Sequence, residues 1–93
     1  MEPIILMKDD SLMVSGPLTL KTVSKLFDQP LVFNSAAQVI DLKEVTHIDS
    51  AGLALLIHWS HEAQRAQSRA VYCNLPENLK ELAQLCMLDE MFR

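Results

Sequence analysis

The stretch that decides the fold is VIDLKEVTHIDSAGLALLIHW, residues 39–59. Its first four residues, 39–42, are β-prone and bounded by charged residues, and they predict a buried strand. Asp49 and Ser50, both favourable helix N-caps, precede a long apolar pattern of helical period. The stretch therefore predicts a strand, a loop and a capped helix, with a hydroxyl beside a carboxylate where the helix begins.

The predicted helix start has two physical consequences. Its free backbone N–H groups favour an anion or another hydrogen-bond acceptor. Ser50 is either the cap or the first exposed hydroxyl, where a phosphate or a partner can reach it. Gly52 lies in the first helical turn, where glycine is costly compared with alanine. A glycine at this position predicts a close backbone approach, either to the sheet or to a partner.

The remaining pattern predicts a single α/β domain over residues 1–93. Its element order is β-β-α-β-α-β-α, a mixed sheet of about four strands with helices packed on it. The other expected strands are 4–7, 12–15 and 70–73, and the other expected helices are 20–29 and 76–86. We expect residues 8–11 to form a hairpin turn and Gly16-Pro17 to end the second strand. Thr19 is the expected cap of helix 20–29 and Pro30 its stop, while residues 31–37 have no assignable pattern.

The helical periods also predict which side chains face inward. In the first helix these are Leu20, Val23, Leu26 and Phe27; in the second, Leu53, Leu56, Ile57, Ser60 and Ala63; in the third, Leu79, Leu82, Ala83 and Cys86. On the second helix, Ala54, His58, His61 and Arg65 share the opposite side. The strand after the second helix, 70–73, should lie parallel to 39–42 through a right-handed crossover.

Composition excludes several classes of function. The 93 residues are 49% apolar and 22% charged, as in an ordinary globular domain, and the net charge is −4. An acidic chain without a basic stripe is a poor candidate for nucleic acid or for an anionic membrane surface. A basic protein partner remains compatible with this charge.

The same composition predicts a cytoplasmic protein. No apolar run reaches the roughly 18 residues of a membrane span. Glu2 and the lack of an early basic region argue against a signal peptide. Cys73 and Cys86 lie singly among hydrophobic residues and are interpreted as reduced, buried cysteines rather than a disulfide. If the protein serves a membrane system, we expect it to do so by docking from the cytoplasm.

The residues of the helix start resemble a known signature. Asp49-Ser50-Ala51-Gly52-Leu53, following the predicted strand, is similar to the signature of the STAS domain family, which includes anti-anti-sigma factors and small domains attached to transporters. The segments 14–18 and 85–89 also fit, so the resemblance covers nearly the whole chain. Residues 52–58 are most similar to the small STAS subunits of ABC complexes that maintain lipid asymmetry in the outer membrane.

This resemblance implies a non-enzymatic subunit that needs no cofactor. Its implied partner is the ATPase subunit of a phospholipid-transporting ABC complex, which assembles with a permease at the inner membrane. The alternative implied by the family is an anti-anti-sigma factor that binds an anti-sigma kinase. In that branch the hydroxyl matching Ser50 is phosphorylated by the kinase, and phosphorylation releases the partner.

The expected contact surface lies around the helix start. The residues assigned to partner binding are Phe27, Asp49, Ser50, Ala51, Gly52, Leu53, Ala54 and His58. Phe27 is interpreted as either a core residue or part of an apolar patch beside the Ser50 loop. Trp59 is more often a core residue in this kind of pattern.

Two other chemistries have weaker signals. His47 and Asp49 project to one side of an extended segment, as a catalytic base and acid would, but no nucleophile or further acid accompanies them. His58 and His61 share a helix face at a spacing that metal sites use, but no third ligand is placed to complete the site. We therefore expect no catalytic residue and no metal, and interpret Asp49 as a helix cap.

Overall fold

The described residues form a four-stranded sheet and three helices. The computed structural model describes residues 3–8, 10–29, 31–33 and 35–85. Within these residues the strands are β1 (Ile4–Lys8), β2 (Ser11–Leu18), β3 (Gln38–Ile48) and β4 (Ala70–Cys73), and the helices are α1 (Ser24–Phe27), α2 (Ser50–Arg65) and α3 (Glu77–Leu85). The predicted order of elements and the mixed α/β class are confirmed.

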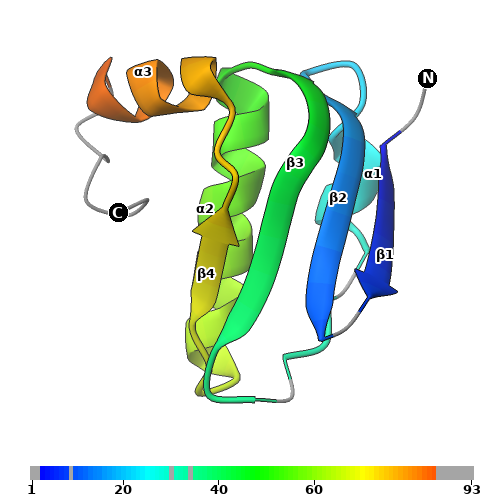
Figure 1. The fold of residues 1–93 in the computed structure, drawn as a ribbon, viewed down its shortest axis with the longest axis vertical. Coiled ribbons are helices and arrows are strands. Elements are labelled where there is room, and N and C mark those ends of the chain that lie inside the picture. Colours follow the sequence, from blue (N-terminus) through cyan, green and yellow to red (C-terminus); the bar gives the residue numbers. More distant parts are fainter. Residues whose placement is uncertain (1–2, 9, 30, 34, 86–93) are drawn as a thin grey trace.

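The sheet has the strand order β1-β2-β3-β4. β1 and β2 pair antiparallel across the predicted hairpin, whereas β3 pairs in parallel with both β2 and β4. In Figure 1, α1 and α2 lie behind the sheet, and α3 crosses the end at which α2 begins. Because β3 runs parallel to β2 and β4, the carboxyl ends of these three strands lie at one end of the sheet, and α2 begins there.

The core lies between the sheet and α2. Alternate residues of β2 point into it, and Val14 and Leu18 are fully buried. Of the predicted inner face of α2, Leu53, Leu56 and Ala63 are buried, but Ile57 and Ser60 are only half-buried. Leu55 and Trp59 are buried in their place, so the buried face is rotated from the predicted one. The predicted outer residues are half-buried or exposed. From α3, Leu79 and Ala83 are buried as expected and Leu82 is half-buried against the core; the Cys86 prediction falls outside the described residues.

Both central strands are longer than predicted. β2 does not end at Gly16-Pro17 but continues to Leu18, and β3 continues beyond 42 to Ile48. The two extensions pair with each other, with register shifts at two points, so that Leu18 lies opposite Ile48. Pro17 is tolerated because β1 pairs with β2 only as far as Ser15, which leaves that side of the strand open.

The first helix is shorter than predicted. The helix expected over 20–29 is confined to Ser24–Phe27, and its N-cap is Val23, without a side-chain cap, rather than Thr19. The Thr22 hydroxyl donates to the Pro17 carbonyl oxygen (2.8 Å), and the Thr22 oxygen accepts from the Thr19 N–H (3.0 Å). These bonds hold 19–23 in turns, and Leu20, expected inward, is 77% exposed.

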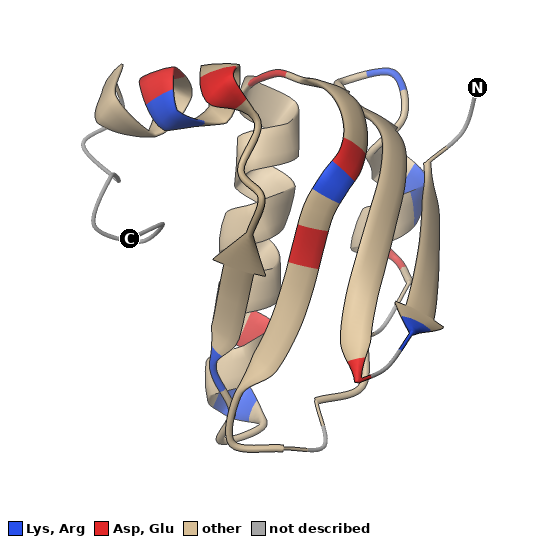
Figure 2. Cartoon of the chain, viewed as in Figure 1, with Lys and Arg blue, Asp and Glu red and all other residues tan. Residues whose placement is uncertain are grey.

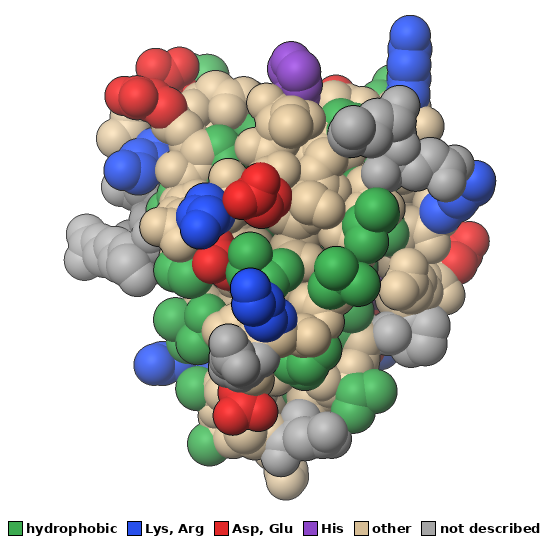
Figure 3. Space-filling model, turned by 45° about the vertical axis from the view of Figure 1, so that its right-hand side comes forward, with side chains coloured by type: hydrophobic (Ala, Val, Ile, Leu, Met, Phe, Trp, Pro, Cys, Tyr) green, Lys and Arg blue, Asp and Glu red, His purple; other side chains and the backbone are tan. Residues whose placement is uncertain are grey.

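The face of the sheet opposite α2 bears no helix among the described residues. On the view in Figure 3, apolar side chains there lie between charged ones; Ile4 and Leu6 of β1 are more than half exposed. Cys73 is a free cysteine, as predicted, but it is half-buried rather than buried, because β4 is an edge strand. Desolvation and the neighbouring Asp41 carboxylate raise the pKa of its thiol.

Candidate functional site: the start and outer face of helix α2

Asp49 organises the start of α2. Its Oδ1 atom accepts hydrogen bonds from the backbone N–H groups of Ala51 (2.9 Å) and Gly52 (3.2 Å), so it is the predicted N-cap. Its Oδ2 atom accepts from the Leu20 N–H at 3.1 Å. One carboxylate therefore joins the start of α2 to the connection between β2 and α1, a link that the local sequence pattern did not show.

Gly52 brings the first turn of α2 against the end of β2. A Cβ atom on this residue would lie 2.3 Å from the Leu18 carbonyl oxygen and 2.6 Å from Cγ1 of Ile48. The close approach predicted for this glycine is therefore made to the sheet. Leu53 is only 2% exposed. Gly52 and Leu53, both assigned to partner binding from the sequence, therefore pack against the sheet and present no side chain at the protein surface.

Ser50 is the first residue of α2 and is exposed. Because Asp49 is the N-cap, the Ser50 side chain does not cap the helix. The Ser50 hydroxyl forms no hydrogen bond within the described residues. The hydroxyl therefore stands at the positive end of the helix dipole, open to a phosphate or a partner atom.

An uncharged surface runs from Ser50 along the outer side of α2. Ser50, Ala54 and His58 follow one another at spacings of four and so lie on one face. No Asp, Glu, Lys or Arg occurs between Ser50 and His61, as Figure 2 shows by the tan colour of the upper turns of α2. Charged residues are depleted at the centres of protein interfaces. We call Ser50, Ala54, His58 and Phe27 the outer face.

Phe27 joins this face further along the helix than predicted. Its ring lies against the imidazole of His58, with the ring centroids 5.2 Å apart and the planes tilted by 43°. His58 is eight residues beyond Ser50, about 12 Å along the axis, so Phe27 extends the surface from the Ser50 loop to the middle of α2. Its 38% exposure keeps part of the ring available for contact.

The charged end of α2 follows this surface. Glu62 lies 3.6 Å from the Arg65 guanidinium and 4.0 Å from Nε2 of His58. Both contacts are at or near the surface and contribute little to stability. They close the outer face with polar groups, as the rim of an interface does.

The Asn78 side chain fixes the neighbouring end of α3. Its Nδ2 donates a hydrogen bond of 2.6 Å to the carbonyl oxygen of Ile48, the last residue of β3. Together with the Asp49–Leu20 bond, this contact secures the residues before Ser50 from two sides. Sequence reasoning missed Asn78, because it pairs with a residue 30 positions earlier in the chain.

The geometry does not favour the alternative chemistries. Both oxygens of the Asp49 carboxylate accept backbone hydrogen bonds, so this group is committed to holding the loop and not to exchanging a proton with His47. In the part of the chain that the structure describes, no three His, Cys, Asp or Glu side chains gather as metal ligands do. Nor is any helix in that part long and apolar enough to span a membrane.

Comparisons with known proteins agree with this fold and signature. The family model described as "Mlab, STAS domain" matches residues 6–93, nearly the whole chain. The protein therefore belongs to this family of STAS domains.

Among solved structures, the chain is similar to the anti-sigma factor antagonist SpoIIAA in its unphosphorylated form. The TM-score is 0.63 at 13% sequence identity, over 89% of this chain and 82% of that one. At this identity the likeness establishes a shared fold. No curated protein sequence gives a significant match.

Proposed function

We propose that this protein is a non-catalytic, MlaB-like subunit that docks on the ATPase of a phospholipid-transporting ABC complex. The partner would be an MlaF-like ATPase assembled with its permease, with this chain held on the cytoplasmic side of the inner membrane. There it stabilises or regulates the ATPase and so affects lipid traffic between the inner and outer membranes. The family description and the similarity of residues 52–58 to such subunits support this partner.

The observation that carries the proposal is the uncharged outer face of α2. A partner that covers Ser50, Ala54 and the Phe27–His58 pair would bury apolar and aromatic surface without desolvating a formal charge at its centre. The buried backbone contacts of Gly52 and the three bonds to Asp49 hold this face in one conformation. Docking therefore requires little further ordering of this face, so the loss of conformational entropy on binding is small.

The experiment is affinity purification of the tagged protein from its native cells in mild detergent. Wild type should retain an ABC ATPase and its permease, whereas Ser50→Glu should lose them, because the added charge would have to be desolvated in the interface. Ser35→Glu is the matched control, since Ser35 is exposed in the connection before β3 and should leave binding unchanged. Recovery of no ATPase with the wild type would contradict the proposal.

A second candidate is an anti-anti-sigma factor switched by phosphorylation of Ser50. The exposed hydroxyl at the start of α2 favours it, because a kinase can reach this atom and the helix start tolerates the added negative charge. In the same purification this reading requires a soluble kinase as the captured partner. It also requires a phosphate on Ser50 in the protein that is not bound.

A further inference from the structure

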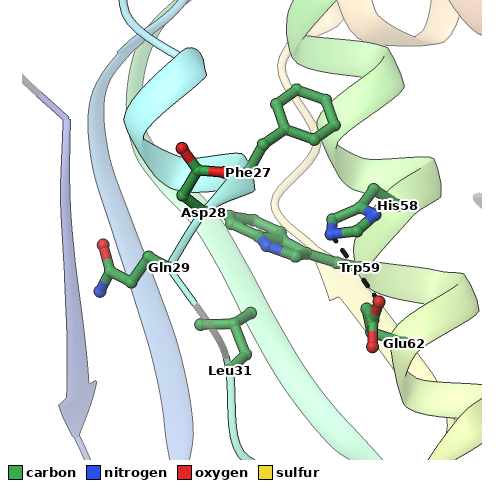
Figure 4. Close-up of a pocket in the computed structure, with 7 residues that line it drawn as sticks. All are labelled: Phe27, Asp28, Gln29, Leu31, His58, Trp59 and Glu62. Atoms are coloured by element: carbon green, nitrogen blue, oxygen red, sulfur yellow. Dashed lines mark ion pairs between the residues drawn. The ribbon is translucent and has the colours of Figure 1, made fainter.

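Two cavities border α1, and their charged side chains have opposite signs. The first, of about 210 Å³, lies between α1 and the middle of α2, and its charged lining in the described residues is Asp28 and Glu62 (Figure 4). The second, of about 190 Å³, lies between α1 and the segment that leads into β1, and its charged lining in those residues is Lys21 and Lys25. Both lysines appear as blue segments in Figure 2, one in the connection before α1 and one on α1. We call the second cavity the basic pocket.

The lining of the basic pocket is rich in hydrogen-bond donors. Lys21 and Lys25 are exposed, and an ammonium group can only donate. The Ser24 hydroxyl and the Gln29 carboxamide, which also line the pocket, can donate as well. Lys21 forms no ion pair within the residues that the structure describes. A carboxylate, which only accepts, matches this lining in charge and in hydrogen bonding, whereas a guanidinium or ammonium group would be repelled.

The basic pocket adjoins the start of α2. Leu20 precedes Lys21 in the chain, and its backbone N–H donates to Oδ2 of the Asp49 cap at 3.1 Å. The rim of the pocket is therefore tied to the residue before Ser50. The Leu20 side chain is 77% exposed at this place. A protein that covers Ser50 would meet an apolar side chain and then a cation at the edge of the outer face.

The surroundings favour a protein over a membrane as the source of the anion. Attraction to an anionic lipid surface requires several cations together, whereas here two lysines adjoin a cavity with two carboxylates, in a chain of net charge −4. A single carboxylate side chain can reach Lys21 while Asp28 and Glu62 repel it from the first cavity. The opposite signs on the two sides of α1 thereby favour one orientation of a partner on the outer face.

We propose that the basic pocket receives the carboxylate of an aspartate or glutamate of the docked partner protein. The carboxylate accepts hydrogen bonds from the Lys21 and Lys25 ammonium groups, and an apolar side chain of the same partner segment covers Leu20. This inference rests on the proposed function, because it gives the ATPase subunit a charged contact at the rim of the outer face. Such rim charges act mainly on the rate of association and on its salt dependence.

The first test reverses the charge of the pocket. Lys21→Glu should weaken binding to the purified ATPase–permease complex about tenfold, chiefly through slower association, because two carboxylates then face each other. Lys8→Glu is the matched control, since Lys8 is exposed at the far end of β1 and the substitution changes the net charge equally. It should alter affinity less than about twofold, because charges far from the contact are screened. Equal losses in the two variants would overturn the inference, and circular dichroism checks that both fold.

The second test uses salt. Raising NaCl from about 0.05 M to about 0.5 M should slow the association of wild type, because the shorter Debye length screens the attraction. Lys21→Gln removes the charge without reversing it and should give a flatter salt dependence. Parallel salt dependences of wild type and Lys21→Gln would contradict a charged contact at Lys21.

The third test needs no ATPase. Backbone amide resonances of ¹⁵N-labelled protein are followed during titration with the peptide acetyl-Leu-Glu-Glu-amide or its neutral counterpart acetyl-Leu-Gln-Gln-amide. The acidic peptide should shift the resonances of residues 20–29 saturably in wild type but not in Lys21→Glu, and the neutral peptide should not shift them. Vesicles of phosphatidylglycerol should not sediment the protein. Sedimentation that Lys21→Glu abolishes would assign the pocket to lipid and overturn the inference.

The outcomes separate this inference from the proposed function. If wild type and Lys21→Glu bind the ATPase complex equally and the acidic peptide shifts nothing, the inference fails while the transporter proposal stands. If wild type does not bind the ATPase complex but the acidic peptide still shifts residues 20–29, the transporter proposal fails and the pocket still recognises an acidic protein segment.

Discussion

The first turn of α2 and its middle differ in how completely their polar groups are hydrogen-bonded. At the first turn, backbone touches backbone through Gly52, and every oxygen of the Asp49 carboxylate is hydrogen-bonded. In the middle, one flank is anchored by Tyr72, whereas the other contains the buried indole N–H of Trp59, which has no hydrogen-bond partner among the described residues. The comparison indicates that folding satisfies the polar groups at the helix start, whereas the Trp59 flank leaves one buried donor unsatisfied in the described structure.

Gly52→Ala should break the close contact at the first turn. The new Cβ atom would lie 2.3 Å from the Leu18 carbonyl oxygen, which belongs to the backbone of a central strand and cannot move aside cheaply. We expect a loss of about 3 kcal/mol or more in the free energy of unfolding, at the upper end of overpacking costs. Urea unfolding measures it, and Ser50→Ala, an exposed neighbour, should change stability by less than about 0.5 kcal/mol.

Tyr72 provides a test of the anchored flank. Its hydroxyl donates to the Leu56 carbonyl oxygen and lies 3.0 Å from Oγ of Ser60, and burial raises the pKa of Tyr72 from its ordinary 10.0 to about 12. The unfolded chain loses this proton near pH 10 and the folded chain near pH 12. The folded state is therefore favoured fully below pH 10, and this contribution is lost as the pH rises through 12.

A pKa difference of about 2 corresponds to roughly 3 kcal/mol, reached near pH 12. Urea unfolding of wild type between pH 9 and pH 12 should show this loss, and Tyr72→Phe should remove that part of the pH dependence. Equal slopes in the two proteins would show that Tyr72 is not held neutral by its burial.

Asp49→Ala removes the shared acceptor at the start of α2. Loss of an N-cap side chain costs about 0.5–2 kcal/mol, and we expect the upper part of that range because Asp49 also holds the Leu20 N–H. Asp49→Asn keeps one side-chain oxygen and should retain part of the stability. A result in which Ala and Asn are equally stable would contradict the role of two separate oxygens. Thermal unfolding ranks the three proteins.

Trp59→Phe should have the smallest effect. It removes an indole N–H that has no partner in the described structure, so the gain from deleting this donor offsets part of the packing lost with the smaller ring. We expect a change within about 1 kcal/mol in chemical denaturation, compared with about 3–5 kcal/mol for Trp59→Ala. A large loss in Trp59→Phe would mean that the N–H is hydrogen-bonded in solution.

The elements governed by strong local signals could be predicted from sequence. The first half of β2, the Asp49 cap and the apolar helical pattern of α2 each follow from neighbouring residues. The place of Ser50 at an exposed helix start followed from the same pattern. Its role in binding stays a prediction.

The errors arose where distant residues decide the local structure. α1 was predicted too long because the apolar period of 20–29 contains no sign of Asp49. This residue, 29 positions away, accepts a hydrogen bond from the Leu20 N–H. β2 and β3 were predicted too short because the two extensions pair with each other and are held by contacts from Gly52 and Asn78, all distant in the sequence. The cavity that Phe27, Leu31 and Trp59 line was not foreseen, because Leu31 lies in a segment without any hydrophobic period. The residues that meet in these contacts lie too far apart in the sequence for a local pattern to include both.

The long-range bond between Asp49 and Leu20 also makes the outer face a reporter of complete folding. The hairpin of β1 and β2 can form early from neighbouring residues, but Leu18 meets Ile48 only after a loop of about 30 residues has closed. A partially folded chain thus has no assembled helix start to present. A partner that recognises this face would bind only fully folded molecules, and binding would protect them from unfolding and proteolysis.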